Sequence, residues 1–276
     1  MRFLILGSSG LIGYSLFKLL EKTDNEVFGT YNSNKLTHNK YKKKIIKFNA
    51  LNKRNLIKII NNYRPNIVIN CIGITKHIKL KKKSEIFKIN SKFPHFAKRV
   101  SNKKLAKFIQ ISTDCVFDGK KGNYTEKSIP NADDIYGISK ARGEIEDNKN
   151  LTIRTSTIGH EYFSKRGLLE WFLSQKVQCD GYSKAYFNGF PTYYFSKILL
   201  KIIKLNLSGI IHISGKKISK YNLIKIINYQ YKKNIKIKKN TNFSINRTLN
   251  NNLLKKKVGN FDKNWEELIS EMKNAR

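Results

Sequence analysis

The sequence has little cysteine, proline and tryptophan, and it has few acidic residues. Its 276 residues include 3 Cys, 4 Pro and 2 Trp, and 19 Asp and Glu stand against 55 Lys and Arg, which gives a formal net charge of +36. The cysteines are odd in number and widely spaced, without a C-x-x-C pair, at Cys71, Cys115 and Cys179. This spacing excludes a disulfide framework and a cysteine-rich zinc site, and it indicates a reducing, cytoplasmic setting.

Two further absences exclude metal-binding and membrane-spanning classes. The five histidines are scattered without metal-ligand spacing, so we expect no metal site built from the protein's own side chains. No apolar stretch approaches the roughly 20 residues that a membrane-spanning helix needs. The apolar run that follows Arg2 is interrupted at once by Gly7 and Gly10, which is not typical of a signal peptide. We therefore expect a cytoplasmic protein with no membrane partner.

Positive charge is the most abundant feature, and it raises the question of a nucleic-acid partner. A strongly basic balance is typical of proteins that bind nucleic acid or anionic surfaces. The lysine runs, however, lie far apart in the chain and are not interleaved with aromatic residues, at 42–44, 81–83 and 255–257. We interpret most of the excess as a solvated surface and expect no specific nucleic-acid partner.

Short apolar segments alternate with segments of helical periodicity. The apolar segments predict strands at 3–6, 26–31, 45–48, 67–72, 107–112, 151–154 and 210–214. The helical periodicity predicts helices at 11–20, 56–63, 168–172, 197–205 and 221–231. Continuous apolar runs such as 67–72 are typical of strands that are buried on both faces of a parallel sheet. The pattern therefore predicts an α/β fold with a Rossmann-type, doubly wound parallel sheet.

The pattern loosens from about residue 161. Segment 181–192 is rich in aromatic and turn-forming residues, and segment 234–246 is basic with weak alternation. We expect a Rossmann dinucleotide-binding domain at 1–159, joined by roughly 186–223, a small interwoven C-terminal substrate-binding lobe at 160–185 and 224–260, and a C-terminal helix at 261–276.

A glycine-rich turn connects the first predicted strand to the first predicted helix. It reads Gly7-Ser8-Ser9-Gly10-Leu11-Ile12-Gly13, a G-x-x-G-x-x-G variant of the dinucleotide fingerprint. The glycines permit a tight turn, close approach of backbone N–H groups to a pyrophosphate, and close packing of the helix on the strand. The helix N-terminus also attracts phosphate. We therefore predict that a dinucleotide cofactor contacts Gly7, Ser9, Gly10, Leu11, Ile12 and Gly13.

The end of the second predicted strand bears on the choice of cofactor. An acidic residue at this place would bind the ribose 2′-hydroxyl of NAD. The chain instead continues as Thr30-Tyr31-Asn32-Ser33-Asn34-Lys35, which contains no carboxylate to repel a 2′-phosphate. The sequence therefore favours NADP(H), held through Asn32, Ser33 and Lys35, with NAD(H) as the alternative.

Three residues form a candidate hydride-transfer site. Tyr136 and Lys140 are four residues apart, so on a helix they share one face. A phenol has a pKa near 10, and a nearby ammonium lowers that pKa because it favours the phenolate. Thr113 follows a predicted strand, at the sheet edge where doubly wound folds bind ligands. Thr113, Tyr136 and Lys140 therefore predict a carbonyl-binding group, a proton donor and a residue that tunes the donor.

Longer matches point to a family. Ser112–Gly119, Tyr124–Glu126, Tyr136–Lys140 and Gly143-Glu144 resemble the extended short-chain dehydrogenase/reductase superfamily, and within it the dTDP-4-dehydrorhamnose reductase family of sugar-nucleotide reductases. Further matches spread the resemblance over nearly the whole chain, at Asn70–Gly73, Asn90, Pro94, Arg154-Thr155, Pro191-Thr192 and Arg247–Leu249.

The resemblance implies NADPH-dependent reduction of the C4 ketone of a nucleotide-linked 4-keto-6-deoxyhexose, in polysaccharide or deoxysugar biosynthesis. By this resemblance Thr113 polarises the ketone, Tyr136 protonates the developing alkoxide, and Lys140 tunes Tyr136 and holds the nicotinamide ribose. The family's cofactor positions include Cys71 and Gly73. Its substrate positions correspond to Thr113, Asp114, Cys115 and Arg247. A homodimer is an expectation at the family level.

One position departs from the family pattern, and two alternative functions stay open. The family has a tyrosine after Ser-Thr-Asp where this chain has Cys115, which leaves the sugar and the nucleotide open. We interpret Cys115 as a packing residue and not as a nucleophile, because no histidine lies nearby in the sequence to activate it. The alternatives are an epimerase or dehydratase on the same fold, and a non-catalytic nucleotide-binding protein. Dehydratases pair their tyrosine with an acidic couple after the threonine, and Cys115 interrupts that couple here.

Overall fold

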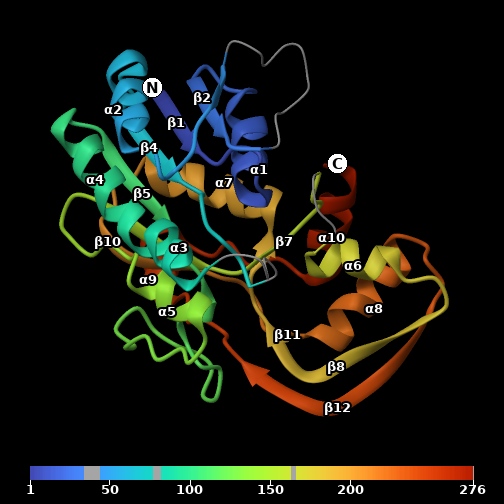
Figure 1. Ribbon diagram of the computed structural model, residues 1–276. Coiled ribbons are helices and arrows are strands. Elements are labelled where there is room, and N and C mark those ends of the chain that lie inside the picture. The colour runs from blue at the N-terminus through green and yellow to red at the C-terminus, as the bar shows by residue number, and fades with distance from the viewer. Residues whose placement is uncertain (34–43, 77–81, 163–165, 276) are drawn as a thin grey trace.

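The computed structural model describes residues 1–33, 44–76, 82–162 and 166–275, and a seven-stranded parallel sheet lies at its centre (Figure 1). The strands are β1 (Arg2–Leu6), β2 (Glu26–Tyr31), β3 (Ile45–Lys47), β4 (Ile67–Asn70), β5 (Lys107–Ile111), β6 (Leu151–Thr155) and β10 (Gly209–Ile213). Their order in the sheet is β10-β6-β5-β4-β1-β2-β3, so the direction of winding reverses between β1 and β4. The predicted Rossmann-type α/β fold is confirmed.

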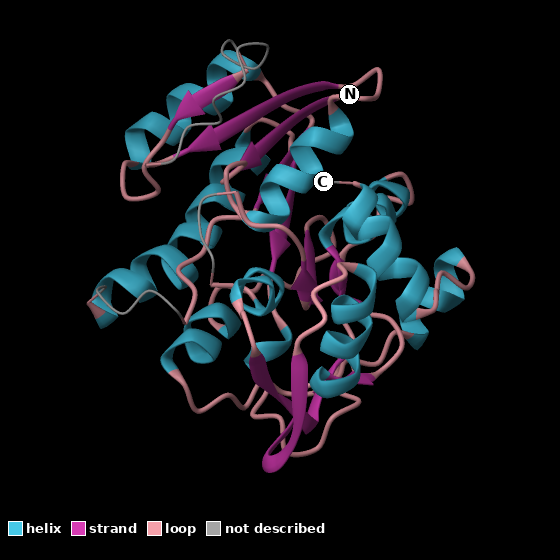
Figure 2. Ribbon diagram, turned by 90° about the vertical axis from the view of Figure 1, so that its right-hand side faces the viewer, coloured by secondary structure: helices cyan, strands magenta, loops and turns pink. Residues whose placement is uncertain are grey.

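Helices cover both faces of the sheet (Figures 1 and 2). One face carries α1 (Leu11–Leu20), α7 (Thr192–Ile203) and α10 (Trp265–Asn274), and the other carries α2 (Lys53–Tyr63) and α4 (Phe93–Lys103). Strand β1 shows how the two cores form, because Phe3 and Ile5 belong to the first core while Leu4 and Leu6 belong to the second. Burial on both faces therefore explains the continuous apolar runs.

A separate three-stranded sheet forms a small lobe at the lower right of Figure 1. Its strands are β11 (Ile218–Ser219), β8 (Gln178–Phe187) and β12 (Lys236–Asn246), in that order. Helix α8 (Lys220–Gln230) packs against β8, and α6 (Leu168–Ser174) precedes β8 in the chain. The boundaries of the substrate-binding lobe, and its role in binding substrate, stay predictions from the sequence.

Strand β8 differs from the turn-rich segment that its composition suggests. Its side chains alternate between buried and exposed, and the buried set includes Gly181 and Ala185. Because glycine and alanine are only weakly hydrophobic, the alternation of buried and exposed positions does not appear in the hydrophobicity of the sequence. A Cβ on Gly181 would lie 2.7 Å from the ring of Tyr221, so the small residue is what lets α8 approach the strand closely.

The remaining described elements are short. They are α3 (Lys83–Phe87), the π-helical turn η2 (Lys88–Lys92), the 3₁₀ turn η3 (Asp114–Val116), α5 (Ile135–Ala141), β7 (Thr157–Ile158), β9 (Phe190–Pro191) and α9 (Asn252–Val258). Within the described ranges, no helix combines the length and the apolar character that crossing a membrane requires.

The register of the sheet places the loops that follow β1, β4 and β5 at one edge. Leu6 pairs with Asn70, and Asn70 pairs with Gln110, so these three strands end at nearly the same level. The Nδ2 group of Asn70 donates a 2.8 Å hydrogen bond to Oε1 of Gln110, which ties β4 to β5 at this level. This is the carboxyl edge, where doubly wound folds bind ligands.

Candidate active site

The glycine-rich turn lies at the carboxyl end of β1 and opens α1. Gly7 has a φ of +84°, a conformation that favours glycine. A Cβ on Gly13 would lie 2.2 Å from the carbonyl oxygen of Gly7, so only glycine lets α1 pack this closely on the turn. Ser9, Gly10, Leu11 and Ile12 occupy the turn and the first residues of the helix, as the fingerprint predicts.

Thr30 in β2 anchors this turn, and the sequence analysis missed it. The Gly7 amide donates a 2.9 Å hydrogen bond to Oγ1 of Thr30, and the Ser8 amide donates a 2.8 Å bond to its carbonyl oxygen. The turn therefore keeps its shape through contacts with the neighbouring strand. Asn32 and Ser33 lie exposed just beyond β2, while Lys35 falls outside the described residues.

The loop after β4 is fixed to the rest of the site by Asn90. Oδ1 of this buried residue accepts a 2.8 Å hydrogen bond from the Ile74 amide, and its Nδ2 donates to the Ile74 carbonyl and to Oγ of Ser139, each at 3.0 Å. One side chain of η2 thus joins the β4 loop to α5. Cys71 and Gly73 therefore hold fixed positions beside α5.

Lys140 is buried in α5 and reaches the ends of the central strands. Its Nζ donates a 2.7 Å hydrogen bond to the carbonyl oxygen of Ile111, and a Cβ on Gly73 would lie 3.9 Å from this nitrogen. Burial lowers the pKa of Lys140 to about 8, while the charge of Glu144 acts in the opposite direction. Burial also raises the pKa of the Cys71 thiol to about 12. Lys140 is therefore a buried positive charge next to the loops that follow β4 and β5.

Tyr136 and Thr113 lie together at the carboxyl edge. Burial raises the pKa of Tyr136, and a hydrogen bond with the Thr113 side chain acts in the opposite direction. The net shift is opposite to the lowering that the spacing of Tyr136 and Lys140 predicts. The physical reason is that burial outweighs the other effects, while the Lys140 ammonium donates to the Ile111 carbonyl.

The backbone around Tyr136 depends on a neighbouring glycine. A Cβ on Gly137 would lie 2.2 Å from the carbonyl oxygen of Cys115 and 2.4 Å from Cβ of Ala132. Asp134 caps the same helix, because its Oδ1 accepts a 2.8 Å hydrogen bond from the Gly137 amide. Gly137 and Asp134 thus seat the first turn of α5 on the loop after β5.

Charged residues surround Asp114 and Cys115. Burial raises the pKa of Asp114, whose Oδ1 accepts a 3.0 Å hydrogen bond from Thr113 Oγ1. Burial likewise raises the pKa of Cys115 to about 12, so its thiol is protonated at neutral pH. Arg247 donates to the Phe117 carbonyl at 2.7 Å and reaches the sulfur of Cys115 at 3.6 Å. The structure thus brings Arg247 to Cys115, which is 132 residues earlier in the chain and directly follows the Ser-Thr-Asp segment.

Lys76 is a second cation at this place, and the sequence analysis did not single it out. It forms an ion pair with Asp134, and its Nζ lies 5.9 Å from the centroid of the Tyr136 ring. Arg247 lies 3.6 Å from the same carboxylate. Asp134 has a sequence signal, since acidic residues cap helices, whereas Lys76 is one of many lysines and has none.

Arg154 helps to hold the residues of the site in place through its contacts with Glu144. Its guanidinium binds Glu144 through two hydrogen bonds of 2.9 and 2.7 Å, and both side chains are buried. Oε1 of Glu144 also accepts a 2.7 Å bond from Ser112. These contacts connect β6, the end of α5 and the residue before Thr113, so Arg154 is part of the scaffold. Among the residues with described positions, no group of three His, Cys, Asp or Glu could hold a metal ion.

Solved structures share this architecture. A hypothetical dTDP-4-dehydrorhamnose reductase from Sulfolobus tokodaii superposes with a TM-score of 0.82 at 27% identity, over 96% of this chain and 97% of that one. A dTDP-4-dehydrorhamnose reductase from Bacillus anthracis, solved in complex with NADP, gives a TM-score of 0.82 at 20% identity, over 99% and 98% of the two chains. The second similarity is one of fold.

Curated relatives align over part of their length. A dTDP-4-dehydrorhamnose reductase from Aggregatibacter actinomycetemcomitans is 31% identical over 170 residues, which are 58% of this chain and 53% of that protein. Methionine adenosyltransferase 2 subunit beta from Danio rerio is 27% identical over 147 residues, 52% of this chain and 43% of that protein. The chain thus spans about half the length of these relatives. A family model described as the RmlD substrate binding domain matches residues 1–274, and the chain therefore belongs to this family.

Proposed function

We propose that the protein reduces the C4 ketone of a nucleotide-linked 4-keto-6-deoxyhexose with NADPH. The observation that carries this proposal is the grouping of Tyr136, Thr113 and Lys140 at the carboxyl edge, beside the glycine-rich turn. A phenol, a hydroxyl and a buried cation are the groups that carbonyl reduction requires. Membership of the RmlD substrate binding domain family supports a nucleotide sugar as the substrate.

The glycine-rich turn fits a dinucleotide. Gly7 and Gly13 leave no side chain between β1 and α1, and the N-terminus of α1 is directed to the carboxyl edge. Strand β2 ends without a carboxylate, and Asn32 and Ser33 lie exposed beyond it, which favours a cofactor with a 2′-phosphate. When bound, NADPH supplies the hydride. The NADP complex of the Bacillus anthracis neighbour supports the same choice.

The raised pKa of Tyr136 suits it to donate a proton. At neutral pH its phenol is protonated, so it can protonate the alkoxide that forms when the ketone accepts a hydride. The hydrogen-bonding side chain of Thr113 orients the ketone beside this phenol. Lys140, with its pKa of about 8, is largely charged at neutral pH and would hold the nicotinamide ribose of the bound cofactor. Together they give the reaction a proton donor, an orienting group and a fixed cation.

The small lobe supplies the other wall of the proposed substrate site. Arg247 follows β12 and reaches Cys115 and Asp134, so the end of the lobe meets the Ser-Thr-Asp segment. We propose that Arg247 and the lobe at 160–185 and 224–260 bind the sugar nucleotide, together with Asp114 and Cys115. Lys76 adds a second positive charge for an anionic substrate.

Tyr136→Phe tests the function. The protein is screened with dTDP- and UDP-linked 4-keto-6-deoxyhexoses while NADPH oxidation is followed, and NADH is compared in parallel. We expect turnover of one such sugar to fall by roughly 10²–10⁴-fold in Tyr136→Phe, while the affinity for NADPH changes little. The matched control is Tyr221→Phe, because Tyr221 and Lys225 have the same spacing in α8. Normal turnover by Tyr136→Phe would refute the mechanism, and a strong preference for NADH would refute the choice of cofactor.

A non-catalytic binding protein is the second candidate. Several relatives are named methionine adenosyltransferase 2 subunit beta, so proteins similar to this chain include a subunit of another enzyme. The complete set of Thr113, Tyr136 and Lys140 favours the enzyme. Binding of NADPH without turnover of any sugar in the screen would favour the second candidate.

A further inference from the structure

A pocket of about 370 Å³ lies on the other side of α1, away from Tyr136. Helices α1, α7 and α10 form its walls, and these helices cover one face of the sheet. Helix α5, which carries Tyr136, packs instead with η2 and η3, and Figure 1 shows it well separated from α10. The pocket has the volume of a small-molecule site. Its wall includes Leu11 of the glycine-rich turn and Tyr162 of the lobe at 160–185, but Tyr136, Thr113 and Lys140 do not line it.

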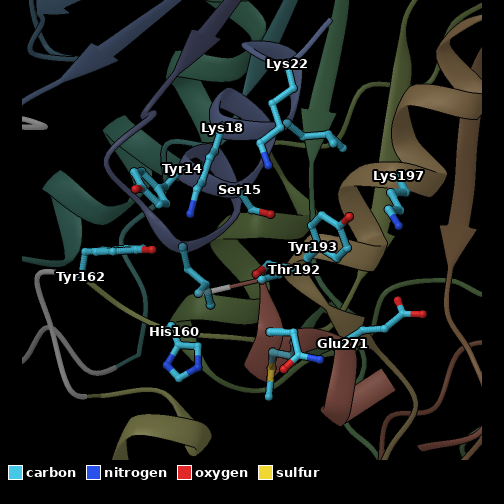
Figure 3. A pocket seen from close by; sticks show the side chains of 15 residues that line it. Tyr14, Ser15, Lys18, Lys22, His160, Tyr162, Thr192, Tyr193, Lys197 and Glu271 are labelled. Carbon is cyan, nitrogen blue, oxygen red and sulfur yellow. The ribbon is translucent and has the colours of Figure 1, made fainter. Parts of the chain in front are cut away.

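The pocket is rich in positive charge. Lys18 lies on α1, Lys22 lies in the turn that follows α1, and Lys197 comes from α7 on the opposite side (Figure 3). Within the ranges that the structure describes, none of these three ammonium groups lies within 4 Å of a carboxylate. Three unneutralised cations around one cavity suit a phosphate group.

Aromatic rings lie beside these cations. Tyr14 and Tyr162 contact each other with ring centroids 4.2 Å apart, and Lys197 lies 4.4 Å from the centroid of Tyr193. All three rings line the pocket. Aromatic faces next to lysines are suited to a ligand that carries a planar base as well as a phosphate.

Glu271 lines the pocket and carries a buried acceptor atom without a partner among the described residues. Its Oε1 binds Lys263, which neutralises the charge, whereas its Oε2 is buried without a partner among the described residues. A buried polar atom without a partner is costly, and a ligand that donates a hydrogen bond would remove that cost. The amino group of a base or a ribose hydroxyl is such a donor.

We propose that this pocket binds a nucleoside phosphate, with the phosphate held by Lys18, Lys22 and Lys197 and the base placed against the tyrosines. The inference does not depend on the reductase activity, because it concerns binding on a different face of the sheet. The same chemistry explains all three observations: the lysines without a carboxylate within 4 Å, the aromatic rings in the pocket wall and the unsatisfied acceptor.

Photolabelling with 8-azidoadenosine 5′-monophosphate, followed by peptide mapping, tests this proposal. We expect labelled residues within 14–22 or 192–197, protection by excess AMP, and labelling at least about tenfold weaker in Lys18→Glu/Lys22→Glu, as expected when charge-assisted contacts are lost. Lys256→Glu/Lys257→Glu on α9 makes the same change in net charge away from the pocket and should label like the wild type. Lys197→Glu, an exposed position, gives an independent variant if the double variant does not fold.

Three outcomes would overturn the proposal. One is unchanged labelling in both pocket variants. Another is labelling confined to the loops after β1, β4 and β5, which would mean that the probe occupies the cofactor or substrate site. The third is protection by inorganic phosphate as strong as protection by AMP, which would mean that the rings contribute nothing. None of these outcomes depends on turnover of a sugar, so this test and the test of Tyr136 fail separately.

Discussion

His212 is a histidine that the fold keeps neutral. It is fully buried in β10, its Nδ1 donates a 3.1 Å hydrogen bond to the carbonyl oxygen of Asn250, and its Nε2 has no partner among the described residues. Burial lowers its pKa to about 3, and the charge of Arg154 acts in the same direction. The sequence could not reveal this, because His212 is one of five scattered histidines.

The burial of His212 predicts a loss of stability in acid. An unfolded chain binds a proton at His212 below a pH of about 6.5, whereas the folded protein does not until a pH of about 3. The stability that this residue contributes is therefore complete above about pH 6.5 and is lost as the pH falls towards 3. Between about pH 7.5 and about pH 5, the free energy of unfolding should fall by roughly 2 kcal/mol more in the wild type than in His212→Gln. Urea unfolding at the two pH values measures this difference, and an equal fall in both proteins would contradict it.

Close packing between elements decides the shape of the candidate active site. Helix α5 meets the β5 loop only because position 137 is glycine, and a Cβ on Gly143 would likewise lie 1.9 Å from the carbonyl oxygen of Asn90 in η2. The spacing of Tyr136 and Lys140 predicts that they share a helix face. It does not predict how that helix is seated, which depends on contacts with segments far away in the sequence.

The Glu144–Arg154 pair connects β6 to the segment that follows α5, and removing one partner should be costly. Glu144→Gln leaves the buried Arg154 without its counter-ion, so we expect a loss of about 3–5 kcal/mol in the free energy of unfolding. The matched control is Glu267→Gln, which removes one exposed ion pair with Lys263 and should cost at most about 1 kcal/mol. Denaturant unfolding of the two variants provides the comparison. Similar small losses in both would show that the buried pair does not support the site.

The net charge of +36 is a property of the whole molecule, and the structure gives it a partial explanation. Lys76, Lys140 and Arg247 lie around the candidate active site, and Lys18, Lys22 and Lys197 surround the second pocket. These are a small part of the 55 basic residues. The positive field nevertheless suits the capture of anionic ligands such as a dinucleotide and a sugar nucleotide.

This field predicts a salt dependence. Raising the ionic strength from about 0.05 M to about 0.5 M shortens the screening length, so KM for NADPH and for the sugar nucleotide should rise several-fold while kcat changes little. Steady-state kinetics at constant pH measure both constants. Binding to RNA should be weak and should disappear at about 0.15 M salt. Tight RNA binding that resists salt would contradict the view that the charge is mostly a solvated surface.

The sequence by itself determined the α/β class, the glycine-rich turn and the spacing of Tyr136 and Lys140. These features depend on local periodicity, on glycine in a tight turn, and on four-residue spacing in a helix, all of which a linear pattern contains. The tertiary structure decided that Arg247 and Lys76 meet at Asp134, that Thr30 anchors the glycine turn, and that burial raises the pKa of Tyr136. Such contacts join residues far apart in the chain, and desolvation depends on everything packed around a group. Only the folded molecule specifies them.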